Sequence, residues 1–206
     1  MRWLDKRGEL PAGTPELPHV HVPDHQPTIP SPAQLAQILE QIPLIDRGQF
    51  FARSSMGLRP REARSAMAKD FNFDENLLSV VGKGGRLRVL PASPVVAEWI
   101  HAHVTAQARV SGAFLFARSD GRPWSVSSSA RTWAAACRAA GLADQDGKPL
   151  FRENEGCRHA FGTHAVGVGE KDVFSVSAFM GHSNVETTKR YVKQSARDLA
   201  KVVRVK

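Results

Sequence analysis

Apolar side chains recur at helical spacing along most of the chain from residue 31 onward. The first such segment begins with Ser31 as a capping residue, Pro32 at the first helical position and Gln34 where the partner of a capping box belongs. The same reasoning predicts further helices, and it places them over residues 47–54, from about residue 60, after Ser93-Pro94, over residues 127–142 with Gly141 as the stop, and in the final third.

The hydrophobic period changes between residues 77 and 91. The runs "LLSVV", residues 77–81, and "RLRVLP", residues 86–91, flank the glycine-rich stretch "GKGG" of residues 82–85. Glycine supplies the positive φ values of a tight turn, so this pattern predicts a β-hairpin. The predicted fold class is therefore mainly α with a small antiparallel β-sheet, an α+β fold.

Residues 1–30 differ in composition from the rest of the chain. Seven prolines occur between Pro11 and Pro32, and such a density favours an extended segment over a packed element. This segment also carries four potential metal ligands, for which a solvated linker is the favoured interpretation over a metal site; they are His19, His21, Asp24 and His25. We expect ordered structure to begin at Ser31.

The charge balance points to a polyanionic partner. Lys and Arg number 28 against 20 Asp and Glu, which gives a net charge of +8. Such an excess favours nucleic acid before membrane. No apolar run approaches the roughly 20 residues that span a bilayer, and the first ten residues do not resemble a signal peptide. We therefore expect a cytoplasmic protein with no membrane partner.

The two cysteines favour neither a zinc site nor a disulfide framework. Cys137 and Cys157 lie 20 residues apart without a second pair. Cys137 falls in an alanine-rich helical pattern, where a small buried thiol is the expected role.

Four separated stretches of the chain carry the residues that can do chemistry. They are "GLRPREA" (57–63), "VGKGGRLRVLP" (81–91), "CRHAFGTH" (157–164) and "MGHSNVETTKRY" (180–191), the last ending in the only tyrosine of the chain. Each stretch alone is a weak signal. Together, in this order and spacing, they resemble the catalytic domain of the tyrosine recombinase, or phage integrase, family. The resemblance covers roughly residues 30 to 195 and implies a catalytic domain at residues 31–195. Residues 196–206 are left as a basic C-terminal tail or helix.

The resemblance implies a DNA strand-breaking and rejoining enzyme, a site-specific recombinase. Tyr191 would attack the scissile phosphate and form a 3′-phosphotyrosyl link, which conserves the energy of the broken bond. Arg59 and Arg158, 99 residues apart, match the two arginines that stabilise the charge on the non-bridging oxygens.

Two further residues complete the implied site. Lys83 stands at the hairpin position from which the family donates a proton to the leaving oxygen, a task that suits an ammonium whose pKa is lowered by neighbouring positive charge. His182 matches the histidine that hydrogen-bonds the same phosphate. The resemblance implies neither a metal nor another cofactor, because protein cations hold the phosphate.

Each of these residues also has an ordinary structural interpretation. Arg59 could simply begin a helix, Arg158 could lie on the surface, and a lysine in a turn is usually just solvated. His182 could cap a helix end, and Tyr191 could be a core ring. Glu62 and Asp70 match acidic positions with a supporting role, and Glu62 could orient Arg59.

Glu155 departs from the family pattern, which usually has a histidine three residues before the second arginine. An ionised carboxylate about 5 Å from a phosphate would repel it by roughly 3 kcal/mol at an effective dielectric constant of about 20. Neutralisation by Arg158 or protonation would reduce this penalty. Glu155 could replace the histidine as the base that accepts the tyrosine proton, or it could mark a decayed site.

The second departure concerns the DNA clamp, because family members commonly carry an N-terminal helical domain and only the proline-rich segment precedes Ser31 here. Fewer phosphate contacts weaken binding, so we expect poor binding to random duplex DNA at 150 mM salt. A catalytically decayed DNA-binding protein and a type IB topoisomerase-like enzyme are the alternative functions.

The tail bears on assembly. Residues 189–206 contain seven basic side chains and one acidic one. In the family a segment of this kind packs on a neighbouring protomer of a tetramer on double-stranded DNA; a frayed tail is the alternative. If the tail does link protomers, removal of residues 196–206 should weaken self-association.

Overall fold

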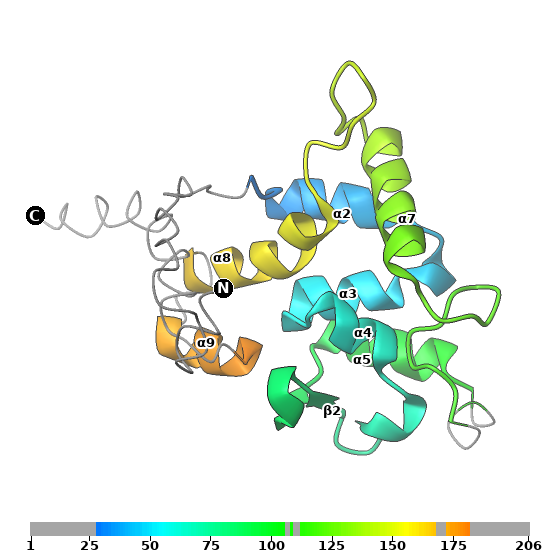
Figure 1. The fold of residues 1–206 in the computed structure, drawn as a ribbon, viewed down its shortest axis with the longest axis vertical. Coiled ribbons are helices and arrows are strands. Elements are labelled where there is room, and N and C mark those ends of the chain that lie inside the picture. The colour runs from blue at the N-terminus through cyan, green and yellow to red at the C-terminus, as the bar shows by residue number, and fades with distance from the viewer. Residues whose placement is uncertain (1–27, 106–107, 109–111, 168–171, 182–206) are drawn as a thin grey trace, which may run out of the picture.

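The computed structural model describes residues 28–105, 108, 112–167 and 172–181 (Figure 1). These residues form a mainly helical fold with one three-stranded antiparallel sheet, which confirms the predicted fold class. The proline-rich segment up to residue 27 and the tail lie outside the described residues. In the described part, no helix is both long and apolar enough to cross a membrane.

The first helices follow their local start signals. Helix α2 (Pro32–Glu40) has the predicted capping box, in which the Gln34 backbone N–H donates to Ser31 Oγ at 3.2 Å and the Ser31 N–H donates to Gln34 Oε1 at 2.9 Å. A short 3-10 turn, η1 (Leu44–Asp46), leads into α3 (Gly48–Met56). Helix α3 ends at Gly57, whose φ of 64° is in the left-handed region.

The predicted hairpin forms two strands of the sheet. After α4 (Pro60–Ser65) and η2 (Ala68–Asp70), strand β1 (Phe71–Asn72) pairs with β2 (Leu77–Val81), which pairs with β3 (Leu87–Pro91). A 3-10 turn, η3 (Lys83–Gly85), joins β2 to β3, and Gly84 has a φ of 77°. The cross-strand pairs Leu78–Leu90 and Val80–Arg88 share the inner face of the sheet.

The remaining helices complete the fold. They are α5 (Pro94–His103), α7 (Val126–Ala139), the π-helical segment η4 (Glu155–His159), α8 (Ala160–Gly167) and α9 (Val173–Met180). Gly141, predicted as the helix stop, follows α7 with a φ of 71°. The final third was predicted to be helical, but the π-helical form of η4, which is continuous with α8, was not predicted.

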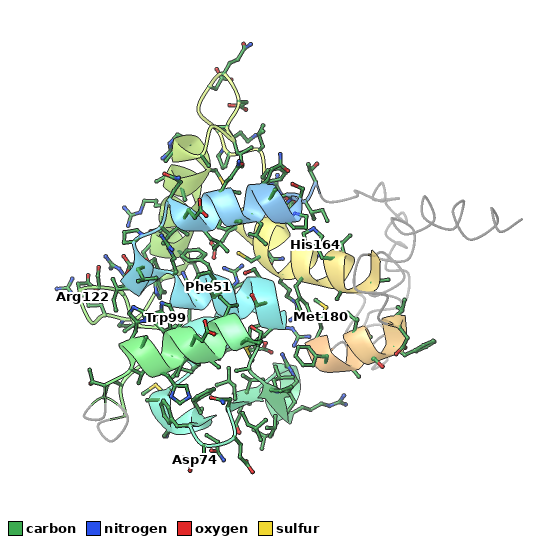
Figure 2. The ribbon with its side chains drawn as sticks, turned by 180° about the vertical axis from the view of Figure 1, so that it is seen from behind. Phe51, Asp74, Trp99, Arg122, His164 and Met180 are labelled. Carbon is green, nitrogen blue, oxygen red and sulfur yellow. The ribbon has the colours of Figure 1, made fainter. Side chains whose placement is uncertain are left out.

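Helix α3 lies between two hydrophobic clusters (Figure 1). One cluster joins α3 to α5 and the sheet, and the other joins α3 to α2 and α7. Figure 2 shows Phe51 of α3 beside Trp99 of α5. Burying aromatic side chains on both sides makes α3 the central support of the fold, and its C-terminal end is the place where the candidate site is built.

Both cysteines are buried and free, as expected for Cys137. Burial raises the pKa of the Cys137 thiol to about 11, and it does the same for Cys157. Among the described residues, no three His, Cys, Asp or Glu side chains are grouped to hold a metal ion.

Candidate active site

Arg59 stands at the junction between α3 and α4. Pro60 at the first position of α4 keeps Arg59 extended, with φ −69° and ψ 151°. Glu62, one turn into α4, accepts hydrogen bonds from the Arg59 backbone N–H at 2.8 Å and from Arg59 Nη1 at 2.9 Å. The Arg59 side chain keeps 30% of its surface exposed, so its guanidinium is both held and accessible. This confirms that Glu62 orients Arg59.

The carboxylate of Glu62 also binds Arg88 on β3. Arg88 Nη1 donates to Oε1 at 2.9 Å and Arg88 Nη2 donates to Oε2 at 2.8 Å, which is the two-pronged geometry of a guanidinium on a carboxylate. Burial alone would raise the pKa of Glu62, but the hydrogen bonds from Arg88 and Arg59 outweigh it and the pKa is lowered. Glu62 is therefore an anion between two cations.

Arg158 comes to the same place from the opposite side of α3. It lies in η4 with 5% of its surface exposed. Its Nη1 donates to the Gly57 carbonyl at the end of α3, and its Nη2 donates to the Met180 carbonyl at the end of α9, at 2.9 Å. Figure 2 shows Met180 at the end of α9 that faces α3. Two helix C-termini thus fix this guanidinium through their free carbonyl groups.

The two arginines converge on consecutive residues. Arg158 contacts the carbonyl of Met180, and Arg59 Nη2 donates to the carbonyl of Gly181 at 2.5 Å. Gly181 ends α9 with a φ of 68°, and a Cβ at this residue would lie 2.8 Å from Arg88 Nη1. Only glycine therefore combines this backbone conformation with this close approach.

The other predicted site residues are described only in part. The structure places the backbone of Lys83 at the start of the hairpin turn, while its side chain lies outside the described part. His182 follows Gly181 directly in the sequence, and both His182 and Tyr191 lie outside the described residues. Their roles remain predictions.

Glu155 occupies the first position of η4. Its Oε2 accepts a hydrogen bond from the Arg152 backbone N–H at 3.2 Å, so the carboxylate caps the turn that leads into the segment of Arg158. A role for Glu155 as a base stays a prediction.

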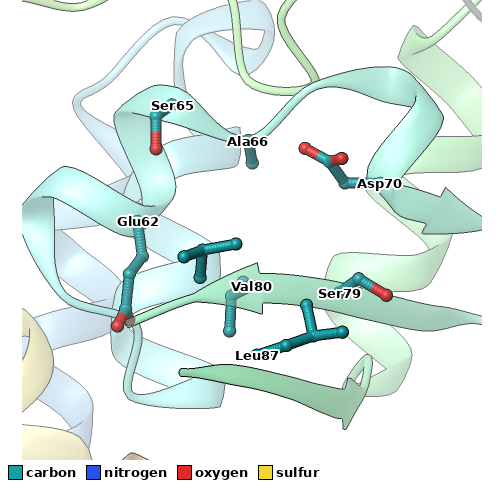
Figure 3. A pocket seen from close by; sticks show the side chains of 8 residues that line it. Glu62, Ser65, Ala66, Asp70, Ser79, Val80 and Leu87 are labelled. Atoms are coloured by element: carbon teal, nitrogen blue, oxygen red, sulfur yellow. The ribbon is translucent and has the colours of Figure 1, made fainter. Parts of the chain in front are cut away.

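A pocket lies between α4 and the hairpin (Figure 3). Glu62 and Asp70 stand at opposite ends of it, and Ser79, Val80 and Leu87 of the hairpin form one side. Asp70 Oδ2 accepts the Met67 backbone N–H at 2.8 Å, which holds the turn after α4. Asp70 therefore has a supporting role in the local structure, as its position in the sequence suggested.

A buried polar network anchors η4 to α3. The Arg53 side chain is fully buried and pairs with Glu153, which also accepts a hydrogen bond from Ser129 Oγ. Ser129 in turn accepts from Gln49 Nε2 at 3.0 Å. Since Glu153 comes two residues before η4, this network fixes the start of the segment that carries Arg158.

Arg88 and Arg53 were not among the residues predicted from the sequence. A signal for Arg88 was present, because alternation along "RLRVL" puts Arg88 on the same face as the core residue Leu90. A charged residue at an inward position of a strand needs a partner, and here the partner is Glu62. The position of Arg53 was a similar signal, because this charged residue lies on the buried side of α3 together with Phe50 and Met56.

Comparison with known proteins identifies the family of this chain. Residues 33–197 match the model described as the phage integrase family. The chain belongs to the phage integrase family. The tyrosine recombinase XerC of Rhodospirillum centenum is 29% identical over 215 residues, covering 98% of this chain and 60% of the relative. The tyrosine recombinase XerD of Bifidobacterium longum is 28% identical over 201 residues, covering 93% and 63% respectively.

Solved structures agree with this membership of the phage integrase family at the level of the fold. The XerA recombinase gives a TM-score of 0.72 at 18% identity, over 89% of this chain and 68% of that protein. The XerH recombinase bound to its palindromic difH substrate in a post-cleavage complex gives 0.68 at 20% identity, over 88% and 54%. The chain spans about 60% of the length of the XerC and XerD relatives.

Proposed function

We propose that this chain is the catalytic part of a site-specific recombinase that cuts and rejoins double-stranded DNA. The observation that carries the proposal is the convergence of Arg59 and Arg158 on the carbonyls of Met180 and Gly181, immediately before His182. Two guanidiniums from residues 99 apart at one turn provide the concentrated positive charge that a phosphodiester transition state requires.

In this proposal Tyr191 is the nucleophile. Its oxygen forms a bond to phosphorus while the bond from phosphorus to the 5′-oxygen breaks, and the phosphate stays on the protein as a 3′-phosphotyrosyl ester. Arg59, Arg158 and His182 stabilise the negative charge on the non-bridging oxygens. The reverse attack by a 5′-hydroxyl of another strand releases the tyrosine and completes strand exchange.

Two proton transfers accompany this step. The 5′-oxygen takes a proton from Lys83 on the hairpin turn. The tyrosine hydroxyl gives its proton to a base, for which Glu155 is the candidate. The role of Glu155 and the role of Lys83 rest on their positions in the family pattern.

We propose that residues 31–195 form the catalytic domain, between the proline-rich segment 1–30 and the tail 196–206. The match of residues 33–197 to the family model supports these bounds. Double-stranded DNA is the proposed substrate, and solved structures of similar fold include the lambda integrase bound as a dimer to a core DNA site. We propose a tetramer on DNA, acting in the cytoplasm.

Covalent capture on nicked duplexes tests the proposal. The substrates are a pool of nicked duplexes that carry sequences flanking the gene and a randomised core. After cleavage, the short strand with the 5′-hydroxyl diffuses away, so rejoining is prevented and the phosphotyrosyl adduct is trapped. Wild type should give a protein–DNA adduct on a denaturing gel. Tyr191→Phe, which differs by one hydroxyl, should give none, while Arg59→Lys and Arg158→Lys should lower the rate by about 100-fold or more.

Glu155→His distinguishes an active site from a decayed one. Adducts in both wild type and Glu155→His would show that the carboxylate is compatible with cleavage. An adduct in Glu155→His alone would instead indicate a DNA-binding protein that has lost cleavage. An adduct that persists in Tyr191→Phe would overturn the assignment of the nucleophile.

A further inference from the structure

Arg88 is a partly buried cation to which the proposed reaction gives no direct role. Its side chain is 16% exposed, and it projects from β3 toward the inner face of the sheet, in the pair with Val80. Both of its Nη groups donate to Glu62. This two-pronged contact commits the Nη1–Nη2 edge of the Arg88 guanidinium to the carboxylate.

We propose that Arg88 is a positioning residue for Arg59, acting through their shared carboxylate, Glu62; this rests on the proposed function. The first reason is geometric. The Glu62 side chain is 3% exposed and each of its oxygens binds both arginine residues, so the place of Arg59 Nη1 depends on where Arg88 holds the carboxylate.

The second reason is electrostatic. Arg59 and Glu62 alone would form a neutral pair, and an incoming phosphate would meet the carboxylate as well as the guanidinium. With Arg88 the three groups carry a net charge of +1, so the negative charge of Glu62 is offset by a second cation, whose side chain is 16% exposed against 30% for Arg59. Arg59 is thereby left to act on the phosphate.

The third reason is the location of Arg88 between two turns of the site. Its Nη1 would be 2.8 Å from a Cβ at Gly181 and 3.3 Å from a Cβ at Gly82. Gly82 precedes Lys83 on the hairpin, and Gly181 precedes His182. The Arg88 guanidinium therefore fills the space between the two backbone segments that lead into those residues, and both glycines give it room.

A measurement without DNA tests the geometric part. The side-chain N–H resonances of Arg59 are followed by NMR in wild type, Arg88→Met and Arg88→Lys, and are assigned by their loss in Arg59→Lys. The matched control is Arg86→Met, which removes the same charge from an exposed residue of the same hairpin. We expect Arg88→Met to move these resonances toward those of a free arginine, and Arg86→Met to leave them in place.

A cleavage measurement tests the chemical part. Arg88→Met should lower adduct formation by about 100-fold on a normal phosphate, the size of effect that a misplaced group produces. Arg88→Lys, which keeps the charge, should lose less. With a neutral methylphosphonate at the scissile position there is less charge for Arg59 to stabilise. The ratio of the wild-type rate to the Arg88→Met rate should therefore fall toward one on this substrate. The ratio of the wild-type rate to the Arg59→Met rate should fall in the same way.

The outcomes separate this proposal from its alternatives. Unchanged Arg59 resonances in a folded Arg88→Met protein would overturn the proposal, and so would an equal loss of cleavage on both substrates. A third result would also overturn the proposal: restored cleavage by Arg88→Met on a substrate with sulfur as the 5′-bridging atom. Such a leaving group needs no proton, so Arg88 would then act through Lys83, the proposed proton donor. If wild type forms no adduct, the proposed function fails, and the NMR measurement still decides whether Arg88 holds Arg59.

Discussion

Arg59 Nη2 donates a 2.5 Å hydrogen bond to the carbonyl of Gly181, a residue 122 positions later in the chain. This contact ties the start of α4 to the end of α9. Because Gly181 immediately precedes His182, the contact also links the first arginine of the family pattern to the stretch that contains the proposed nucleophile, Tyr191.

Gly181→Ala should be more damaging than its backbone conformation alone explains. A left-handed residue with a side chain costs about 1–2 kcal/mol, and here the added methyl also meets Arg88 Nη1 at 2.8 Å. Gly141→Ala is the matched control, since Gly141 has a φ of 71° and nothing within 4 Å of its Cβ position. Urea unfolding and adduct formation should both show a larger loss for Gly181→Ala. Equal losses in the two variants would refute the close approach.

Much of the local structure could be predicted from the sequence, whereas most contacts of this junction could not. The cap at Ser31 and the hairpin glycines act on neighbouring backbone, so these features can be predicted from residues that are adjacent in the sequence. Glu62 could be expected to serve Arg59 because it lies one turn away. The partners of Arg158 are backbone carbonyls of distant helix ends, and any sequence offers carbonyls. No pattern of side chains could have identified them.

The π-helical form of η4 was also beyond prediction. Within η4, Gly156 packs so closely on Trp133 that a Cβ there would be 2.1 Å from the indole ring. The indole is held in place by its own hydrogen bond to the Phe151 carbonyl, at 2.9 Å. The sequence shows a glycine at residue 156, but only the folded structure shows that the Trp133 ring leaves no room for a side chain there.

Gly156→Ala should therefore destabilise the protein by about 1–3 kcal/mol, the usual cost of overpacking a core. Gly167→Ala is the control, because Gly167 ends α8 with nothing within 4 Å of its Cβ position, and its substitution should be neutral or slightly stabilising. Urea denaturation measures both. A Gly156→Ala protein as stable as wild type would contradict the tight packing against Trp133.

Glu62→Gln should change the dependence of stability on pH. The pKa of Glu62 is lowered in the folded protein, so the carboxylate contributes stability that is fully present above its unfolded pKa, about 4.5. That contribution is lost as the pH falls through the lower folded value. Near neutral pH, Glu62→Gln should cost about 3 kcal/mol, because it leaves two partly buried guanidiniums without an anion.

The test of this prediction is urea unfolding between pH 3 and pH 7, two conditions that we choose on either side of the ordinary glutamate pKa. The difference in unfolding free energy between wild type and Glu62→Gln should shrink as the pH falls. Glu40→Gln, at an exposed position of α2, serves as the control and should differ little from wild type at any pH. A difference for Glu62→Gln that stays constant with pH would mean that the carboxylate is not held as an anion.

The buried pair of Arg53 and Glu153 should respond asymmetrically to substitution. Arg53 is fully buried and its pKa is lowered by desolvation, so its charge depends on Glu153 for compensation. Glu153→Gln alone should cost about 3–5 kcal/mol, because it leaves an uncompensated buried cation. Arg53→Met combined with Glu153→Gln should cost much less than the sum of the single substitutions, because the neutral pair no longer needs to be desolvated as ions.

The rate of adduct formation by the Arg53→Met, Glu153→Gln double variant shows whether this ion pair also matters for cleavage. Glu153 lies just before the segment of Arg158, so a double variant that is stable yet slow in cleavage would show that the ion pair sets the position of Arg158 as well as contributing to stability. We expect this result, with normal binding of the same duplex. If Glu153→Gln instead costs less than about 1 kcal/mol, the pair behaves like a surface salt bridge. The buried network would then have no part in holding η4 against α3.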